Sequence, residues 1–336
     1  MSEYIAISKN ALVEGTKIDF DLFLKNNHNG RSRYILFCHG NQQFGPQLRG
    51  ELLNRNVEQF YISSKDKDKY LVYQEQNLKQ IVEDSSKNSL QKSGALYQVA
   101  KNLTQDILKD PLPAHTIERA SVWVGNTITH IIQNENTFST LIEVTSHDYH
   151  TYTHSINVSV IGLLFGKYLS LKPNELECLG TGLLLHDIGK SSLSQDIMTK
   201  RGDLTSEEFN IIKRHPKAGL DLLEDNKKID GTSLKVVIQH HENHDGTGYP
   251  YGIGGSDIHL FGHISRIIDA YDAMTSDRPY AAAMRPFATL VELKGEMDGC
   301  FNNELLKEFI CFLGLKESRK KPRVDDILQT SSPMVE

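Results

Sequence analysis

Short apolar runs separated by turn-forming residues occupy the first part of the chain. The segment NNHNG, residues 26–30, predicts a hairpin turn, and the spacing of apolar residues predicts helices over 47–53 and 69–82. Four apolar runs have the length of β-strands, at residues 4–7, 20–24, 34–37 and 60–62. The pattern therefore predicts a small α+β domain at the N-terminal end.

Apolar residues recur at helical spacing through most of the remaining chain. One stripe runs from Leu96 to Ile107 and ends before Pro111, and a second covers residues 117–132. Further helices are expected over residues 156–169, 175–185, 206–223 and 234–241, without any alternating strand pattern. The expected fold class is an α+β N-terminal domain followed by an all-α helical bundle.

These patterns divide the chain into four segments. Residues 1–90 are expected to form the α+β domain, and residues 91–140 a helical linker. Residues 141–315 are expected to form the helical bundle, and residues 316–336 a polar tail. Because the linker helices are amphipathic, they could also pair with a second copy of the chain, so a homodimer is expected.

Composition narrows the class of protein. The chain has 37 Lys and Arg residues against 43 Asp and Glu residues, a net charge of -6, which argues against duplex nucleic acid as a partner. No stretch approaches the roughly 18 apolar residues of a membrane span, and the start shows no signal peptide. The four cysteines match no common metal or redox spacing. We therefore expect a cytoplasmic protein with reduced thiols.

Histidine is concentrated in one part of the chain. Ten of the 14 histidines lie between His147 and His263, about twice the number that even spacing gives. An isolated pair such as His186-Asp187 is more often a hydrogen-bonded couple in a core than a metal site. Here, however, several predicted helices carry candidate ligands, and a bundle can direct such side chains to one interior point. The imidazoles and carboxylates suit iron, manganese or zinc better than a thiolate zinc site.

Three sequence blocks in this region resemble the signature of one family. HDIGK at residues 186–190, HHENHDGTGYP at 240–250 and DAYDAMTSDRPY at 269–280 are similar to the blocks of the HD-GYP cyclic di-GMP phosphodiesterases, within the HD phosphohydrolase superfamily. The resemblance covers about residues 141–315 and implies that this segment is an HD-type catalytic bundle. It also implies that the preceding α+β domain is a regulatory module of unidentified ligand.

The resemblance implies a metal site and a reaction. Asp187 is expected to bridge two divalent cations, with iron or manganese favoured and zinc compatible. Such a site acidifies a shared water, and the resulting metal-bridged hydroxide would cleave cyclic di-GMP to the linear dinucleotide pGpG, and then to GMP, in bacterial second-messenger signalling. The metal ligands that the family pattern assigns are His154, His186, Asp187, His215, His240, His241 and Asp269.

Further roles follow from the same resemblance. Lys190 is expected to contact the substrate phosphate and to assist the leaving oxygen, and Arg278 is a second candidate for a phosphate contact, with a structural role equally open. Some family members hold a third metal through a carboxylate four residues before the first ligand histidine. His150 stands at that position, so an optional third ion is expected there.

The GYP segment itself predicts a turn-forming loop. Gly248, Tyr249 and Pro250 are expected near the rim of the site, with Tyr249 exposed, and the family associates this surface with docking of GGDEF-type diguanylate cyclases. Glu242, Asp245 and Asp272 are expected to accept hydrogen bonds from ligand imidazoles.

Two alternatives to this function stay open. The chain could be a catalytically weak receptor or docking module for cyclic di-GMP, in which case metal-loaded protein would bind the dinucleotide without hydrolysing it. It could also perform the same chemistry on 3′,3′-cGAMP, which the relative kcat/KM values on the two dinucleotides would decide. The metal ligands alone do not distinguish these substrates, because the guanine-reading residues are not confined to a motif.

Overall fold

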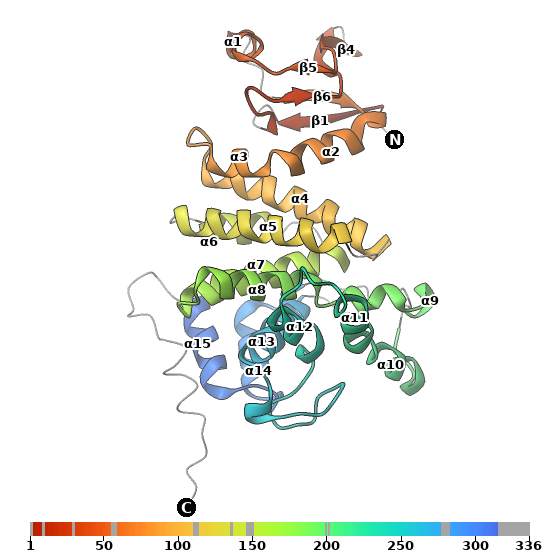
Figure 1. Ribbon diagram of the computed structural model, residues 1–336, viewed down its shortest axis with the longest axis vertical. Coiled ribbons are helices and arrows are strands. Elements are labelled where there is room, and N and C mark those ends of the chain that lie inside the picture. Colours follow the sequence, from red (N-terminus) through yellow and green to blue (C-terminus); the bar gives the residue numbers. More distant parts are fainter. Residues whose placement is uncertain are drawn as a thin grey trace, which may run out of the picture. The chain divides into compact units, whose positions relative to one another are not determined.

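The chain divides into two compact units at Asn102 (Figure 1). The boundary lies within a single long helix, α4 (Ser89–Lys109), which starts in the first unit and ends in the second. The structure is a computed structural model that describes residues 3–8, 11–28, 31–54, 59–109, 114–134, 137–145, 151–198, 200, 202–276 and 283–314.

The N-terminal unit contains a four-stranded antiparallel sheet in the order β1-β6-β3-β4, and a separate two-stranded pair, β2 with β5. Its elements are β1 (Tyr4–Ser8), β2 (Lys17–Ile18), β3 (Leu22–His28), β4 (Arg31–Cys38), β5 (Gln42–Gln43), α1 (Pro46–Asn54), β6 (Gln59–Ser63), α2 (Lys67–Gln76) and α3 (Leu78–Glu83). The predicted hairpin is present, because His28 pairs with Arg31 and only residues 29 and 30, outside the described part, join the two strands.

Aromatic side chains hold this unit together. The ring of Phe20, which is 1% exposed, meets Tyr70 and Tyr73 of α2 edge-on, with centroids 5.6 and 5.5 Å away. The Tyr73 hydroxyl accepts a hydrogen bond from the Val13 amide at 2.8 Å, so a long-range polar contact closes the same core. Helix α2 is thereby fixed against the strand region, as an α+β domain requires.

The predicted helix over 69–82 is in fact two helices, because Asn77 interrupts it. Its side-chain amide donates to the Tyr73 carbonyl at 2.8 Å, and its backbone amide donates to the same oxygen at 3.1 Å. These bonds close the last turn of α2 and allow α3 to start in a new direction.

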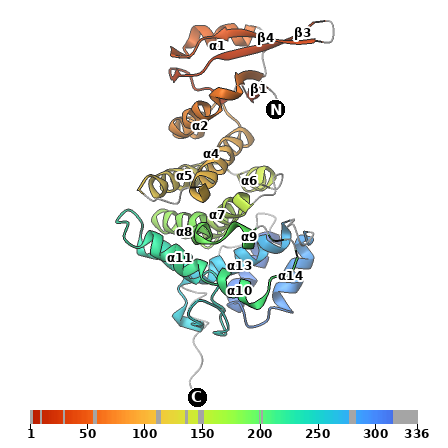
Figure 2. The same ribbon diagram turned by 90° about the vertical axis from the view of Figure 1, so that its right-hand side faces the viewer.

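The C-terminal unit is helical, and no strand occurs among its described residues. After α4, the helices are α5 (Ala114–Gln133), α6 (Thr137–Thr145), α7 (Thr151–Tyr168), α8 (Pro173–Leu185), α9 (Gln195–Met198), α10 (Ser206–Ile212), α11 (His215–Leu223), α12 (Gly231–Gln239), α13 (Leu260–Thr275), α14 (Pro286–Lys294) and α15 (Asn303–Gly314). Helices α7, α8, α12 and α13 form a closed ring in which each packs against two of the others, and α11 packs against α12. Figure 2 shows α7, α8, α11 and α13 gathered in this unit.

The helix predicted over 206–223 is broken between α10 and α11. Pro216 stands in the first turn of α11, where its fixed φ angle suits a helix start and its missing N–H costs nothing. Because Pro216 has no N–H to donate to the carbonyl of Ile212, α10 ends at that residue and the chain turns at Lys213 and Arg214. The break makes His215 the first residue of a new helix, facing the interior with 0% exposure.

Glycine allows the backbone after α8 to approach α11. A Cβ atom on Gly189 would lie 2.0 Å from the His215 carbonyl oxygen and 2.5 Å from the Gly219 amide nitrogen. Both are backbone atoms, so no side-chain movement could make room. The short 3₁₀ turn Ile188–Ser192 therefore packs with its backbone directly against the start of α11.

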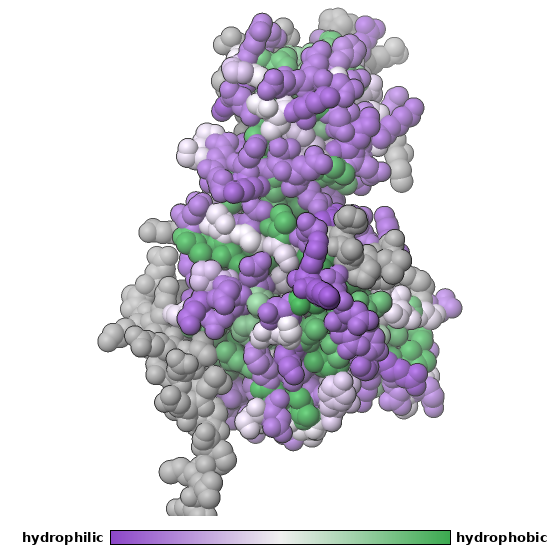
Figure 3. Space-filling view, in the orientation of Figure 1, coloured by the Kyte–Doolittle hydropathy of each residue, from purple (hydrophilic) through white to green (hydrophobic). Residues whose placement is uncertain are grey.

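On the face that Figure 3 shows, the coloured surface is largely hydrophilic, with hydrophobic side chains in scattered patches. None of the helices in the described part of the chain is both long enough and apolar enough to span a membrane.

We predict that Gly189→Ala lowers the free energy of unfolding by about 3 kcal/mol, because the backbones of the 3₁₀ turn and α11 must separate. Urea-induced unfolding would measure the change. Gly94→Ala in α4 is the matched control: nothing lies within 4 Å of its added Cβ, so stability should stay constant or rise by up to about 1 kcal/mol. Equal stability of the two variants would contradict the close approach.

Candidate metal centre

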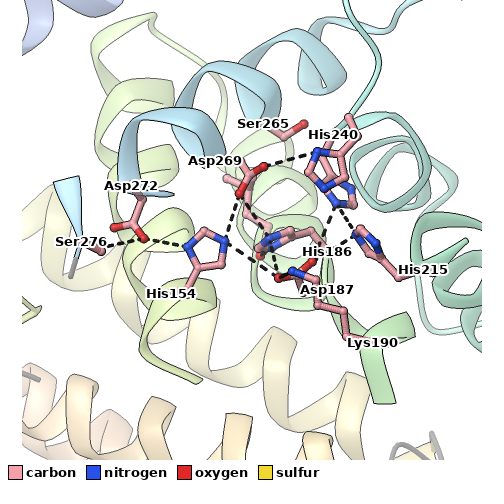
Figure 4. Close-up of polar contacts among 12 residues, drawn as sticks. His154, His186, Asp187, Lys190, His215, His240, Ser265, Asp269, Asp272 and Ser276 are labelled. Atoms are coloured by element: carbon pink, nitrogen blue, oxygen red, sulfur yellow. Dashed lines mark hydrogen bonds and ion pairs between the residues drawn. The ribbon is translucent and has the colours of Figure 1, made fainter. Parts of the chain in front are cut away.

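Five helices each bring a candidate ligand to one interior point (Figure 4). The ligands lie at helix ends or on inward faces, so the rigid backbone of the helix ring fixes their positions. His154 comes from the first turn of α7, His186 and Asp187 directly follow α8, His215 opens α11, His240 and His241 directly follow α12, and Asp269 lies within α13.

Backbone carbonyls set the orientation of three of the imidazoles. The Nδ1 atoms of His186, His215 and His240 lie 2.6, 2.8 and 2.8 Å from the carbonyl oxygen of the residue three positions earlier in each case. A carbonyl oxygen can only accept, so each Nδ1 carries the hydrogen. In the neutral ring, Nε2 then presents a lone pair to the centre, as a metal ligand must.

His154 is oriented by a carboxylate instead. Its Nδ1 donates to Asp272 Oδ2 at 2.7 Å, and its Nε2 lies 3.0 Å from Asp269 Oδ1. Asp272 is 3% exposed and also accepts a weak hydrogen bond from Ser276, at 3.4 Å. Asp272 thus holds the His154 ring in place from the side away from the centre.

The lone pairs that face one another in this cluster indicate that it can bind a cation. His215 Nε2 and His240 Nε2 are 3.0 Å apart, and when both rings are neutral their lone pairs face each other. Nearby, His186 Nε2 and Asp187 Oδ1 are buried without any hydrogen-bond partner. Leaving such groups unpaired costs about 1–3 kcal/mol each, which a bound metal ion would offset.

The donors form two groups with Asp187 between them. His215, His240 and His241 offer ligand atoms within 4.8 Å of one another, as do His154, His186 and Asp269. Asp187 directs Oδ1 toward the first group, 3.3 Å from His215 Nε2. It directs Oδ2 toward the second, 3.4 Å from His186 Nε2. The carboxylate therefore faces both groups with different oxygens, which is the placement that a bridging ligand requires.

Burial tunes the charge states of these groups. Burial lowers the pKa of His186 and His240, and it lowers that of His241 to about 3, so these rings are neutral and able to bind metal. Burial raises the pKa of Asp187, but the Lys190 ammonium outweighs it and holds this pKa well below its usual range.

His154 and Asp269 carry opposite charges in the absence of metal. Burial lowers the pKa of His154, but the hydrogen bonds to Asp269 and Asp272 outweigh it and raise this pKa to about 9. Burial raises the pKa of Asp269, yet the hydrogen bond from His154 and the neighbouring imidazoles hold it well below its usual range. A bound cation would therefore take the place of the His154 proton.

Lys190 lies beside the cluster rather than in bulk solvent. Its ammonium is 2.6 Å from Asp187 Oδ2, and its side chain is 22% exposed, so it lies at the edge of the site. The 3₁₀ turn after Asp187 produces this contact, because residues three apart share one face of such a turn.

Tyr249 is not exposed, contrary to the expectation for the GYP segment. Its ring lies 4.6 Å from that of His241 at an angle of 31°, and the Lys213 ammonium lies 5.5 Å from the centroid of the Tyr249 ring. Gly248 permits this approach, since a Cβ there would lie 2.3 Å from the Asn243 amide nitrogen. The loop is therefore folded against a candidate metal ligand.

The three expected carboxylate acceptors have different roles. Asp272 does hold an imidazole, but Glu242 accepts from the Tyr251 amide at 2.7 Å and Asp245 accepts from the Thr247 amide at 2.9 Å. The latter two shape the GYP loop, so the expectation that they orient ligand imidazoles was wrong. His150 and Arg278 lie outside the described residues.

Sequence reasoning missed the anchoring carbonyls and Lys213. The carbonyls of Leu183, Ile212 and Val237 each precede a candidate ligand by three residues, which is the spacing of a helical turn. The spacing can be read from the sequence, but it is not informative there, because every residue has a backbone carbonyl three positions before it. Nothing local to Lys213 indicated its position near Tyr249.

Comparison with known proteins agrees with this geometry. Residues 138–299 match a family model described as the HD domain. The chain carries an HD domain. The family match includes every candidate ligand named above, and it confirms the resemblance seen in the three signature blocks.

Several curated proteins are similar to the region that contains the HD domain. A cyclic di-GMP phosphodiesterase of Pseudomonas aeruginosa is 31% identical over 218 residues, covering 64% of this chain and 52% of that protein. The cyclic di-GMP phosphodiesterase response regulator RpfG of Xanthomonas campestris is 35% identical over 147 residues, covering 43% and 39%. A 3′3′-cGAMP-specific phosphodiesterase of Vibrio cholerae is 31% identical, covering 50% and 35%. The chain thus spans about half or less of these relatives.

One solved structure shares the fold of both units. Bd1817, an HDG"Y"P protein from Bdellovibrio bacteriovorus, superposes with a TM-score of 0.65 at 20% identity, covering 92% of this chain and 99% of that one. A small N-terminal sheet region followed by a helical HD domain is therefore an architecture that occurs elsewhere.

We predict that Asp272→Asn weakens divalent metal binding about 10–100-fold, because His154 loses the charged acceptor that orients it. Competition with a fluorescent chelator, using Mn²⁺, would measure the affinity. The exposed Asp225→Asn is the matched control and should bind metal as the unmodified chain does. Unchanged affinity of Asp272→Asn would show that His154 is oriented without this hydrogen bond.

A second prediction concerns the metal content. Elemental analysis of the purified chain should find about two divalent ions, and His240→Ala should lose at least one of them because it removes a donor buried at 0% exposure. His39→Ala, in the N-terminal unit, provides the control and should retain the full content. Equal metal content in all three proteins would place the metal elsewhere.

Proposed function

We propose that this chain is a metal-dependent phosphodiesterase that hydrolyses cyclic di-GMP. The observation that carries the proposal is the double group of ligands, in which Asp187 directs one oxygen to each half. The names of the curated relatives support a cyclic dinucleotide as the substrate class. We propose pGpG as the first product and GMP as a second.

The two groups of donors would hold one cation each. His215, His240 and His241 would bind one ion, and His154, His186 and Asp269 the other, with Asp187 shared between them. Two bound divalent cations would lower the pKa of a coordinated water and neutralise charge on the phosphate oxygens. Iron or manganese suits this mixture of imidazole and carboxylate, and zinc is compatible with it. We propose an optional third ion at His150.

Lys190 would bind the substrate phosphate. Its ammonium ion pairs with Asp187 Oδ2 at the edge of the cluster, so it can contact a phosphate oxygen or the leaving oxygen without moving far. A positive charge held at that point stabilises the charge that develops during phosphoryl transfer. Arg278 is proposed for a second phosphate contact.

Hydrolysis of cyclic di-GMP by metal-loaded protein tests the proposal directly. We expect formation of pGpG, and a loss of about 10³-fold or more in kcat/KM in the double variant His186→Ala, Asp187→Ala, because the cations are lost. Chromatography would identify the products. Binding of cyclic di-GMP without turnover by the metal-loaded chain would favour the receptor alternative instead.

Lys190→Met tests the proposed phosphate contact. We expect kcat/KM to fall about 10²-fold while the metal content stays constant, since Lys190 is not a metal ligand. Lys307→Met on α15 is the control, because this exposed lysine pairs only with the neighbouring Glu304 among the described residues. Full activity of Lys190→Met would remove the lysine from the reaction.

The substrate 3′,3′-cGAMP is a second candidate, favoured by the similarity to the Vibrio cholerae enzyme that is specific for it. The ratio of kcat/KM on the two dinucleotides would distinguish them. A ratio in favour of 3′,3′-cGAMP would change the substrate while leaving the proposed metal chemistry intact.

Docking of a GGDEF-type cyclase at Gly248, Tyr249 and Pro250 also belongs to the proposal. The Tyr249 ring lies against His241. The aromatic residue of this loop that faces solvent is therefore Tyr251, which is 57% exposed.

A homodimer through the helices between Leu96 and Ile132 is proposed as well. Val122 and Ile132 on α5 are 50% and 55% exposed, which supports a further contact on this helix.

A further inference from the structure

A cavity of about 780 Å³ lies within the C-terminal unit, beside the metal-ligand cluster rather than in it. Residues of α6, α7, α13, α14 and α15 line it. One face of α14 contributes Phe287, Leu290, Val291 and Lys294, which recur at helical spacing. The apolar side chains of that face are poorly covered, since Phe287 is 79% exposed and Val291 is 57% exposed.

A buried polar atom in the cavity wall has no partner. Asn157 on α7 lines the cavity and is only 8% exposed, yet its side-chain carbonyl oxygen accepts no hydrogen bond. Leaving a buried amide oxygen unsatisfied costs about 1–3 kcal/mol. This oxygen has no accessible surface, so it offers no contact to a molecule in the cavity, and the class of ligand follows from the other lining groups.

Charge and shape indicate the class of that molecule. Lys294 lines the cavity from the last turn of α14 and forms no ion pair within the described part of the chain, so its ammonium is available to an anion. Tyr271, Phe287 and Phe312 place aromatic rings around the cavity, where flat apolar groups pack well. The volume falls in the range of about 300–1,000 Å³ that is usual for small-molecule sites.

We propose that this cavity binds a small aromatic organic anion. The ring system packs among the aromatic side chains, and the anionic group pairs with Lys294. The site is separate from the proposed substrate phosphate position at Lys190, because no residue of the HDIGK block lines it.

Asp272 connects the cavity to the metal centre. This residue lines the cavity and accepts the hydrogen bond from His154 Nδ1 at 2.7 Å. Ser276, which also lines the cavity, donates to the same carboxylate oxygen. A bound ligand therefore touches the pair that orients His154, and it acts as an effector of metal retention. This effect on the metal rests on the proposed metal site, whereas binding of the anion does not.

A titration with 2-naphthoate, and with the neutral 2-naphthylmethanol as its matched ligand, tests the site in the full chain. We expect calorimetry to show one naphthoate per chain and weaker binding of the alcohol, by about five-fold, the effect of losing one partly exposed ion pair. Lys294→Gln should remove that difference between the two ligands, whereas Lys228→Gln, a lysine on the surface away from the cavity, should preserve it.

Leu290→Trp should abolish binding of both ligands, because the larger ring fills the cavity. Val72→Trp on α2 controls for an added surface indole and should bind normally, since Val72 is 53% exposed and does not line the cavity. Far-ultraviolet circular dichroism would show that both variants are folded. Naphthoate binding that survives in Leu290→Trp would overturn the proposal. Binding that appears only after removal of residues 315–336 would assign the cavity to that segment and also overturn it.

Two further measurements separate the remaining outcomes. If the unmodified chain does not bind naphthoate and Leu290→Trp weakens a concentration-dependent dimer in sedimentation, the cavity face is an interface between copies of the chain. The proposal of a small-molecule site is then wrong.

The effector role has its own measurement. Saturating naphthoate should change, by several-fold, the rate at which a chelator removes metal from the unmodified chain. If naphthoate binds but the rate of metal removal stays unchanged, the effector role is wrong and the binding site stands.

Discussion

The buried carboxylate of Asp187 is the group on which the rest of the HD domain depends. Burying a carboxylate costs several kcal/mol unless cations or donors surround it. Here the Lys190 ammonium is 2.6 Å from one oxygen. The Nε2 atoms of His186 and His215 lie within 3.4 Å of the carboxylate with their lone pairs toward the centre, so a bound cation would supply the remaining compensation. His186 and Lys190 flank Asp187 in the sequence, whereas His215 comes from α11, so these groups meet only when the helices have assembled.

The architecture keeps this assembly rigid through backbone contacts. Three candidate ligand imidazoles donate to the carbonyl of the residue three positions earlier, which fixes the ring tautomer without any additional side chain. Gly189 and Gly248 let backbone segments approach one another where a Cβ would collide with backbone atoms. The same ring of helices therefore supplies both the fold and the orientation of the donors, and metal binding should couple to the stability of the domain.

The N-terminal unit and the HD domain show which secondary-structure elements local sequence patterns can predict. The strands of the small sheet and the long helices followed from apolar spacing, because these patterns reflect which face of an element is buried. The breaks at Asn77 and before Pro216 were missed. In both places a capping side chain or a proline overrides a continuous apolar stripe, and a search for apolar periodicity does not register either effect.

The sequence by itself determined the types and spacing of the candidate ligands and, through its signature blocks, the family. It could not show that Tyr249 turns inward onto His241, that Glu242 holds the loop rather than an imidazole, or that Asn157 and Lys294 line one cavity. Only the tertiary structure decided these points. Side-chain direction and proximity between distant segments depend on how helices pack, and helix packing is a property of the whole domain.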